Sequence, residues 1–215
     1  MKAELLRIHP DEPEPHLVAQ VVESLQRGDV VALPTDTFYG LAADPFNLRA
    51  VDRVYDIKTR SRHNPLSLLI ESTDQAEELA KALSEEFYAL ARKYWPGPLT
   101  IIVKAGSRLP LKVTANTGNV ALRVPNAKIP LAVVAAAAIP ITATSANLSG
   151  ASECTSAEQV RDQLQGRVSI IVDGGTSPRD IPSTIIDLTD EGARWRVIRE
   201  GAIPAEEIST FFAKG

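Results

Sequence analysis

Lys58 and Arg60 are the cationic side chains in this sequence that are best spaced to bind phosphate groups. They belong to a run of four positively charged or titratable side chains, completed by Arg62 and His63, in a chain with a formal net charge of -4. In an extended segment, a spacing of two residues places Lys58 and Arg60 on one side, which suits a triphosphate. Cations also gather at the C-terminal ends of helices, where the helix dipole favours them. The run therefore has two interpretations, a phosphate site or a helix end.

The segment TSANLSG, residues 144–150, concentrates polar side chains directly after an apolar run. Thr144, Ser145, Asn147 and Ser149 supply hydroxyl and amide groups within six positions. A turn that leads into a helix would use such side chains to bond nearby backbone groups. The alternative is a ligand site in which they bond phosphate or ribose oxygens, since ligands of open α/β sheets bind at strand ends.

The segment PTDTFYG, residues 34–40, also follows an apolar strand-like run. One interpretation is a turn, because proline fixes φ, Asp and Thr side chains bond the local backbone, and Gly40 tolerates a positive φ. The other is the wall of a polar pocket, in which Thr35 and Thr37 offer hydroxyls to a small ligand and Tyr39 packs beside it.

Two arginines stand at the ends of predicted strands. Arg123 follows the apolar residues 120–122, and Arg199 ends the last predicted strand. Each is either an outward-facing strand residue or a clamp for a carboxylate.

The common catalytic and nucleotide-binding fingerprints are absent from the sequence. It contains no GxxxxGK[ST] loop, no GxGxxG after the first predicted strand, no GxSxG and no HExxH. His9, His16 and His63 are too scattered to indicate a metal centre, so no protein metal site is predicted.

Helical and strand-like apolar patterns alternate along the chain. Helices are expected over residues 16–27, 47–57, from 72 onward, 84–94, 129–138 and 155–164. Strands are expected over residues 29–33, 65–70, 99–104, 119–124, 139–144, 168–172, 183–188 and 194–199. Asn47, Ser72 and the pair Thr155 and Glu158 provide N-capping signals for three of the helices.

This alternation predicts an α/β fold in the form of a three-layer sandwich with about seven strands. The last two strands form a predicted hairpin, which makes the sheet mixed. No internal repeat or break in composition marks a second domain, so residues 1–215 are expected to form one domain.

Composition limits the class of protein. A chain of 215 residues with 44% hydrophobic content can bury one good core. The net negative charge and a pI of about 5.5 do not favour binding to a polyanion.

The single cysteine, Cys154, cannot form an internal disulfide and indicates a reducing compartment, the cytoplasm. The N-terminus has no apolar segment, and the longest apolar run, 129–141, contains two prolines, so neither secretion nor membrane spanning is expected.

Eight short segments in a fixed order resemble the YrdC-like family, the threonylcarbamoyl-AMP synthases. They are PTDTFYGL, KTR followed by NPL, WPGPLT, LRVP, TSANLSG, DGG, STI and IREGAI. The resemblance covers residues from about Val18 to Ile203. It implies a twisted mixed sheet with a concave, positively lined cavity, similar to the fold of dihydroxybutanone phosphate synthase.

The resemblance also implies a reaction. L-threonine, bicarbonate and ATP, which arrives with Mg²⁺, would give L-threonylcarbamoyladenylate and pyrophosphate. Downstream tRNA threonylcarbamoyl transferase proteins would then use the product to modify tRNA, with at most a weak tRNA contact by this chain and no membrane.

The family signature supplies expected roles for eight residues. By this carry-over, the residues that bind ATP are Lys58, Arg60, Ser145, Asn147 and Arg199. Lys58 and Arg60 would also be catalytic, because their charges neutralise the phosphates. The residues that bind threonine would be Thr35, Arg123 and Ser183, with Arg123 as the partner of the substrate carboxylate.

The sequence departs from the family pattern at three places. Asp36 stands where the family often has Glu, and Ser61 follows Arg60 where Pro is common. Many members have a histidine shortly after NPL, where this chain has residues 67–69, Ser-Leu-Leu.

Two competing hypotheses remain beside the synthase. A non-catalytic RNA-binding or ribosome-associated module of the same fold would use the cavity rim to hold tRNA, although the acidic pI argues against it. A relative that handles another carbamoyl adenylate is the second, and the intact SAN motif argues against that one.

Overall fold

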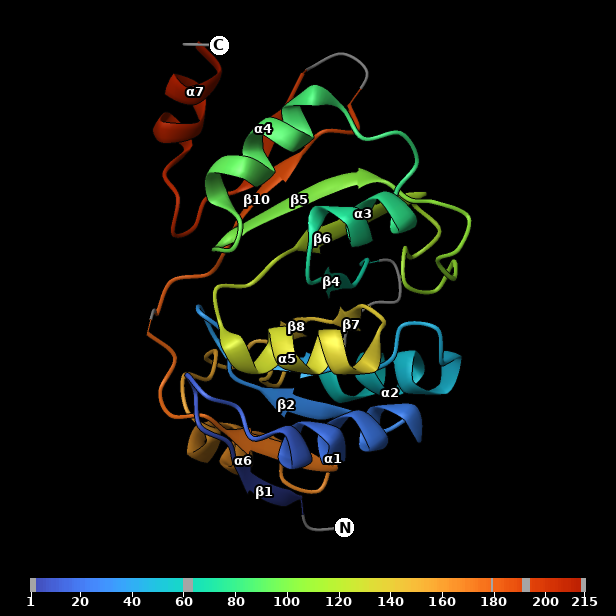
Figure 1. The fold of residues 1–215 in the computed structure, drawn as a ribbon, viewed down its shortest axis with the longest axis vertical. Helices are drawn as coiled ribbons and strands as arrows, with labels where there is room; N and C mark the ends of the chain where they lie inside the picture. Colours follow the sequence, from blue (N-terminus) through green and yellow to red (C-terminus); the bar gives the residue numbers. More distant parts are fainter. Residues whose placement is uncertain (1–2, 60–63, 179, 191–193, 214–215) are drawn as a thin grey trace.

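The structure, a computed structural model, describes residues 3–59, 64–178, 180–190 and 194–213. Arg60, one of the predicted phosphate ligands, lies outside the described residues. The predicted mixed α/β fold is confirmed, and the strands divide between two sheets where the sequence predicts one. In Figure 1 the five-stranded sheet lies in the lower half of the molecule, towards the N-terminus, and the six-stranded sheet lies above it.

Parallel and antiparallel pairs occur in both sheets. The five-stranded sheet has the order β1 (Glu4–Arg7), β9 (Ile170–Asp173), β2 (Val31–Leu33), β3 (Gly40–Ala42) and β8 (Thr144–Ser145). The six-stranded sheet has the order β11 (Arg196–Arg199), β10 (Thr184–Asp187), β5 (Leu99–Lys104), β6 (Asn119–Arg123), β4 (Ser67–Leu69) and β7 (Ile141–Thr142). The expected C-terminal hairpin is present, because β10 and β11 pair antiparallel.

The helices mostly follow the expected ranges. They are α1 (Pro15–Gln26), α2 (Leu48–Lys58), α3 (Thr73–Leu79), α4 (Glu85–Tyr94), α5 (Lys128–Ala137), α6 (Ala157–Leu164) and α7 (Ala205–Ala213). Asn47 caps α2 and Ser72 caps α3, as the sequence predicts. The cap of α6 is Ser156, one residue later than expected, because its hydroxyl accepts from the Gln159 N–H.

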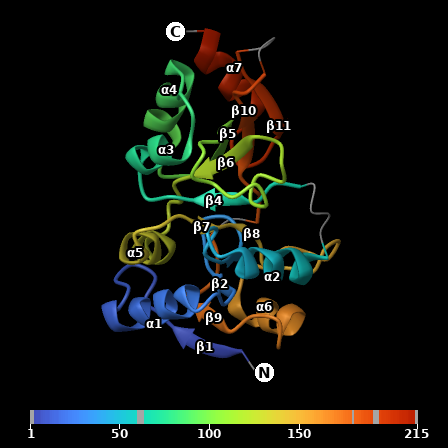
Figure 2. The ribbon, with the colours of Figure 1, turned by 90° about the vertical axis from the view of Figure 1, so that its right-hand side faces the viewer.

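Helices cover both faces of the five-stranded sheet, which gives the predicted three layers. Successive residues of a strand point to opposite faces. Val31 and Leu33 therefore pack with α1 and α5, whereas Val30 and Ala32 pack in the cluster that contains α2 and α6. Figure 2 shows α1 and α5 on one side of this sheet and α2 and α6 on the other.

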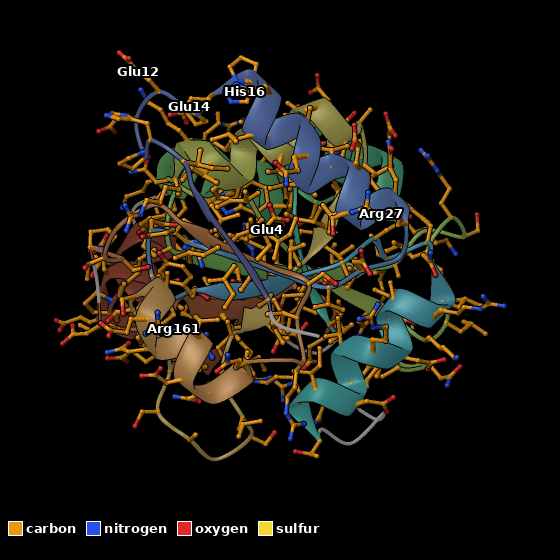
Figure 3. The ribbon with its side chains drawn as sticks, turned by 90° about the horizontal axis from the view of Figure 1, so that it is seen from below. Glu4, Glu12, Glu14, His16, Arg27 and Arg161 are labelled. Atoms are coloured by element: carbon orange, nitrogen blue, oxygen red, sulfur yellow. The ribbon has the colours of Figure 1, made fainter. Side chains whose placement is uncertain are left out.

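The end of the molecule that carries β1, α1 and α6 is a surface exposed to solvent. There Gln20 of α1 donates a hydrogen bond to Glu4 of β1 over 2.8 Å. Figure 3 shows this end from below, with charged side chains such as Arg27 and Arg161 at the surface. None of these residues lines the cavity that lies between the two sheets.

Helices α3 and α4 pack against the six-stranded sheet (Figure 2). Phe87 and Leu90 of α4 belong to the same buried cluster as Leu99 and Ile101 of β5. The indole N–H of Trp95, just after α4, donates to the Leu99 carbonyl over 2.7 Å and fixes the end of the helix against the first residue of the strand.

The single expected strand over residues 139–144 is split between the two sheets. Ile141 and Thr142 pair with β4, whereas Thr144 and Ser145 pair with β3. The chain thus passes from one sheet to the other at Ala143, and this crossing brings the end of each sheet to one place.

Candidate active site

A cavity of about 210 Å³ lies between the two sheets and takes side chains from both. Five of the eight predicted site residues line it, namely Thr35, Arg123, Ser145, Ser183 and Arg199. Lys58 and Asn147 are described but do not line it, and they lie behind the cavity-lining Ser145.

Arg123, the last residue of β6, is buried and held from three directions. Its Nε donates to the Gly97 carbonyl over 2.9 Å, its Nη1 to the Thr37 hydroxyl over 3.1 Å, and its Nη2 to Asp36 Oδ1 over 2.5 Å. Asp36 is buried as well, and its Oδ2 has no hydrogen-bond partner among the described residues. The carboxylate offsets the cost of burying the guanidinium, so Arg123 is fixed in orientation before any ligand arrives.

The segment PTDTFYG combines the two interpretations that the sequence allows. Thr35 Oγ1 donates to the Phe38 carbonyl over 2.7 Å and accepts from the Thr37 N–H over 3.1 Å, which is the local bonding of a turn. Both threonines also line the cavity. The turn is short because β3 begins at Gly40 and returns antiparallel to β2, a strand that the sequence pattern did not reveal.

Ser183 and Arg199 form the opposite wall. The Ser183 hydroxyl lies 2.9 Å from the Thr100 hydroxyl, and Arg199 Nη2 donates to the Ser183 carbonyl over 2.8 Å. Partial burial lowers the pKa of Arg199, while Glu153 raises it. An arginine remains charged at neutral pH after such a shift, so this wall is cationic.

Lys58 is the last residue of α2. Its Nζ lies 2.8 Å from the Ser145 carbonyl, 2.9 Å from the Asn147 carbonyl and 2.5 Å from Asn147 Oδ1. The Ser149 hydroxyl also donates to the Lys58 carbonyl. The ammonium therefore ties the end of α2 to the TSAN turn and sets where the Ser145 hydroxyl stands.

Asn147 is a component of this turn. Its Nδ2 donates to the Ala151 carbonyl over 2.6 Å, and its Oδ1 accepts from the Ser145 hydroxyl over 2.7 Å. The KTR and TSAN segments, predicted separately from the sequence, thus meet in the structure through Lys58.

Three polar residues that line the cavity, Ser67, Thr100 and Glu153, are not predicted from the sequence as ligand contacts. Thr100 lies within the quoted WPGPLT segment, and Ser67 occupies the stretch where many family members have histidine. Glu153 gives no signal in the sequence, since it lies in a polar loop, and it enters the cavity only because of the fold.

Tyr39, which lines the cavity, and Cys154, next to the cavity-lining Glu153, are both buried and do not ionise at neutral pH. The Tyr39 hydroxyl donates to the Gly175 carbonyl over 2.7 Å, and burial raises its pKa to about 12. Burial raises the pKa of the Cys154 thiol to about 11, so this cysteine is a thiol at neutral pH and a poor nucleophile.

The described residues contain no group of three or more His, Cys, Asp or Glu side chains placed to hold a metal ion. None of the helices in the described part of the chain has the length and apolarity that a bilayer crossing requires.

The model of the Sua5/YciO/YrdC family, described as "Telomere recombination", matches residues 23–201. The chain belongs to this family. The matched residues include every predicted site residue and all strands of the two sheets except β1.

Curated family members are similar over most of the chain. A threonylcarbamoyl-AMP synthase of Pyrococcus abyssi is 39% identical over 186 residues, which are 86% of this chain and 54% of that protein. One of Bacillus subtilis is 38% identical over 89% of this chain and 55% of that protein. One of Vibrio vulnificus is 36% identical over 85% of this chain and 97% of that protein. The chain thus spans about half the length of the first two relatives.

Solved structures of the family have the same fold. The crystal structure of P. abyssi Sua5 complexed with L-threonine matches with a TM-score of 0.91 at 35% identity, over 96% of this chain and 60% of that one. Escherichia coli YciO matches with a TM-score of 0.87 at 27% identity, over 95% of this chain and 98% of that one.

Proposed function

We propose that this protein is an L-threonylcarbamoyladenylate synthase, which joins L-threonine, bicarbonate and ATP and releases pyrophosphate. The observation that carries the proposal is the cavity lined by Arg123, Ser183 and Arg199, in a chain that superposes with a TM-score of 0.91 on a Sua5 bound to L-threonine. Relatives named threonylcarbamoyl-AMP synthase support the same reaction. The described residues would act as one YrdC-like domain, since the cavity needs both sheets.

The amino-acid end of the site is assigned to Thr35, Arg123 and Ser183. Arg123 is the proposed partner of the threonine carboxylate because a guanidinium presents several donors in a fixed plane. Its pairing with Asp36 leaves the combination nearly neutral, so it would contribute orientation more than net charge.

The nucleotide end is assigned to Lys58, Arg60, Ser145, Asn147 and Arg199. Ser145 and Arg199 reach the cavity directly, and Lys58 stands behind Ser145. Mg²⁺ would arrive bound to ATP, with oxygen ligands from the phosphates.

The reaction needs positioning and charge neutralisation more than a protein nucleophile. The threonine amine would capture carbon dioxide derived from bicarbonate as a carbamate, and a carbamate oxygen would attack the α-phosphorus as pyrophosphate leaves. Fixed cationic donors stabilise the charge that develops on the phosphates. The inert state of Cys154 agrees with this scheme, which forms no covalent enzyme intermediate.

The product is a mixed anhydride, which a transferase must consume. We assign that step to tRNA threonylcarbamoyl transferase proteins, with a cytoplasmic location and at most a weak direct tRNA contact by this chain. The acidic pI supports the assignment of tRNA modification to other proteins, since strong RNA binding needs a basic surface.

Pyrophosphate release tests the proposal. Purified protein is incubated with ATP, Mg²⁺ and bicarbonate, with and without L-threonine, beside Lys58→Ala and a matched Lys81→Ala variant at an exposed lysine. We expect threonine-dependent release that is retained in Lys81→Ala and falls at least 100-fold in Lys58→Ala. A folded wild type that releases no pyrophosphate in response to threonine would contradict the proposal, and salt-sensitive tRNA binding by that protein would favour the RNA-binding module.

A further inference from the structure

Thr37 lines the cavity within the PTDTFYG loop, and the proposed function gives it no role. Its side chain is buried, with 5% of the residue surface exposed. Arg123 Nη1 donates to the Thr37 hydroxyl over 3.1 Å, and this hydroxyl lies 3.1 Å from Thr35 Oγ1. Thr37 is therefore in direct contact with two of the three residues that are assigned to the amino-acid end of the site.

The hydrogen bonds around the two threonines run in one direction. A hydroxyl has one hydrogen to donate and two lone pairs that can accept. Thr35 donates its hydrogen to the Phe38 carbonyl over 2.7 Å, so it has none left to give to Thr37. The bond between the two hydroxyls is therefore donated by Thr37.

This direction makes the Thr37 oxygen an acceptor towards the cavity. Its hydrogen is used in the bond to Thr35, and one of its lone pairs receives the Arg123 Nη1–H. No described residue donates to its second lone pair. The oxygen can thus accept one more hydrogen bond and can donate none, so it suits a ligand group that carries an N–H or an O–H.

Position selects the ligand group. Carboxylate and phosphate oxygens of the substrates are acceptors and cannot donate to Thr37. The donors are the threonine amine, its β-hydroxyl, the ribose hydroxyls and bicarbonate. Arg123 is the proposed partner of the threonine carboxylate, and the amino nitrogen is attached to the same carbon as that carboxylate. A side chain that bonds the Arg123 guanidinium directly is therefore best placed to meet the amine.

We propose that Thr37 accepts a hydrogen bond from the unprotonated α-amino nitrogen of the amino-acid substrate and orients this nitrogen for attack on carbon dioxide. The proposal rests on the proposed function, which supplies the amino acid and the carbon dioxide. In the attack, the nitrogen lone pair forms the N–C bond and one carbon–oxygen π pair moves to oxygen. One of the two N–H protons neutralises the hydroxide that bicarbonate releases as it gives carbon dioxide. The carbamate keeps the other N–H, which Thr37 holds.

A neutral acceptor suits this step better than a carboxylate would. Only the unprotonated amine has the lone pair that attacks carbon dioxide. A free carboxylate in the same place would stabilise the ammonium form, because an opposite charge nearby favours the charged state. Thr37 carries no charge, and the Asp36 carboxylate is already paired with Arg123. The arrangement can therefore hold the amine in its reactive form.

Ligand binding separates this role from support of Arg123. NMR titration, which also measures millimolar affinities, is carried out with L-threonine, with L-2-aminobutanoate, which lacks the β-hydroxyl, and with (R)-3-hydroxybutanoate, which lacks the amine. The proteins are wild type, Thr37→Val, Thr37→Ser and Thr114→Val. Thr114 is a matched control because it is a buried threonine that donates to the Leu111 carbonyl over 3.1 Å and does not line the cavity.

We expect Thr37→Val to bind threonine and 2-aminobutanoate about five- to tenfold more weakly than wild type, because one hydrogen bond to the ligand is lost. Binding of 3-hydroxybutanoate should change less than twofold. Thr37→Ser, which keeps the hydroxyl, and Thr114→Val should bind threonine within twofold of wild type.

Three results would overturn the proposal. Threonine binding within twofold of wild type in Thr37→Val would show that the hydroxyl does not bind the substrate. Equal weakening of all three ligands would show that Thr37 acts only through Arg123. Weakening confined to the two ligands that carry a hydroxyl would assign Thr37 to the β-hydroxyl. Thr37→Ala, which lets water reach the Arg123 guanidinium, replaces Thr37→Val if that variant does not fold.

The two proposals fail in different ways. A wild type that binds threonine but shows no threonine-dependent pyrophosphate release contradicts the synthase function. A wild type that is an active synthase, with full threonine affinity retained in Thr37→Val, contradicts only the role of Thr37.

Discussion

Lys58 and Arg123 are both buried cations beside the same cavity, with 5% and 7% of their surfaces exposed, yet the protein accommodates them differently. Arg123 has a carboxylate, Asp36, at 2.5 Å. Lys58 has carbonyl, hydroxyl and amide oxygens of Ser145 and Asn147 between 2.5 and 3.3 Å. Arg123 thus faces an ion of opposite sign, whereas these described neighbours of Lys58 are the neutral oxygens of a turn.

The difference assigns the two residues different tasks. A guanidinium paired with a carboxylate is a rigid, nearly neutral donor, which suits orientation of a carboxylate ligand. In the proposed function, the Lys58 ammonium would act over a short distance on a phosphate that Ser145 would contact. Under this proposal the amino-acid end would rely on shape and hydrogen bonding, and the nucleotide end on charge.

Of the substitutions considered, Asp36→Asn should lower the free energy of unfolding most, because it breaks the ion pair between Arg123 and Asp36. The substitution keeps the size of the side chain but leaves the buried Arg123 guanidinium without its counter-charge, and removing one partner of a buried pair typically costs about 3 to 5 kcal/mol. The measurement is the free energy of unfolding in urea. A loss below about 1 kcal/mol would show that the carboxylate does not stabilise the buried guanidinium.

Lys58→Met should lower the free energy of unfolding by less than Asp36→Asn does. The buried carbonyl oxygens of Ser145 and Asn147 lose their donor, which costs about 1 to 3 kcal/mol, but the cost of burying the ammonium is also removed. Urea unfolding beside Lys81→Met, an exposed lysine expected to change stability by less than about 0.5 kcal/mol, measures the difference. A loss larger than that of Asp36→Asn would reverse the comparison.

Tyr39→Phe should lower the free energy of unfolding least at neutral pH. It probes the PTDTFYG segment, which connects the surroundings of Arg123 and those of Lys58. The Tyr39 carbonyl accepts from the Ala146 N–H over 2.7 Å, within the TSAN turn, and its loop carries Asp36. Loss of the hydroxyl bond to Gly175 should cost about 1 kcal/mol.

The same variant has a distinctive pH dependence. The pKa of Tyr39 is about 12 in the folded protein against about 10 when unfolded, so the stability it contributes is complete below pH 10 and is lost as the pH rises to 12. Wild type should therefore lose stability relative to Tyr39→Phe by up to about 1.4 kcal/mol per pH unit in that range. Parallel urea midpoints of the two proteins between pH 8 and 11 would reveal no such trend if the hydroxyl were ionised freely.

Local sequence signals predicted many of the elements. The strand over 99–104 matches β5, and Asn47 and Ser72 cap their helices, because capping and strand alternation depend on residues within a few positions of each other. The missed elements have weak local patterns. Glu4–Arg7 becomes a strand only by pairing with β9, far along the chain, and Gly40–Ala42 does so by pairing with β2 and β8.

The candidate site also has features that the sequence predicts and features that only the fold reveals. The family resemblance predicted eight side chains as ligand contacts, and five of the eight line one cavity. The direction of Lys58 was not predictable, because its oxygen partners lie 87 and 89 positions away in sequence. Glu153 was not predictable for the same reason, since nothing local marks a loop glutamate as a cavity residue.

The sequence by itself determined the helices with clear caps, the alternating faces of the strands and the identity of the polar segments, because these depend on short-range backbone and side-chain preferences. Only the tertiary structure decided that residues 139–144 divide between two sheets at Ala143 and that a cavity forms at that crossing. The reason is physical. Strand pairing is specified by burial and hydrogen bonding between distant segments, and the same apolar run satisfies its local preferences equally well in either sheet.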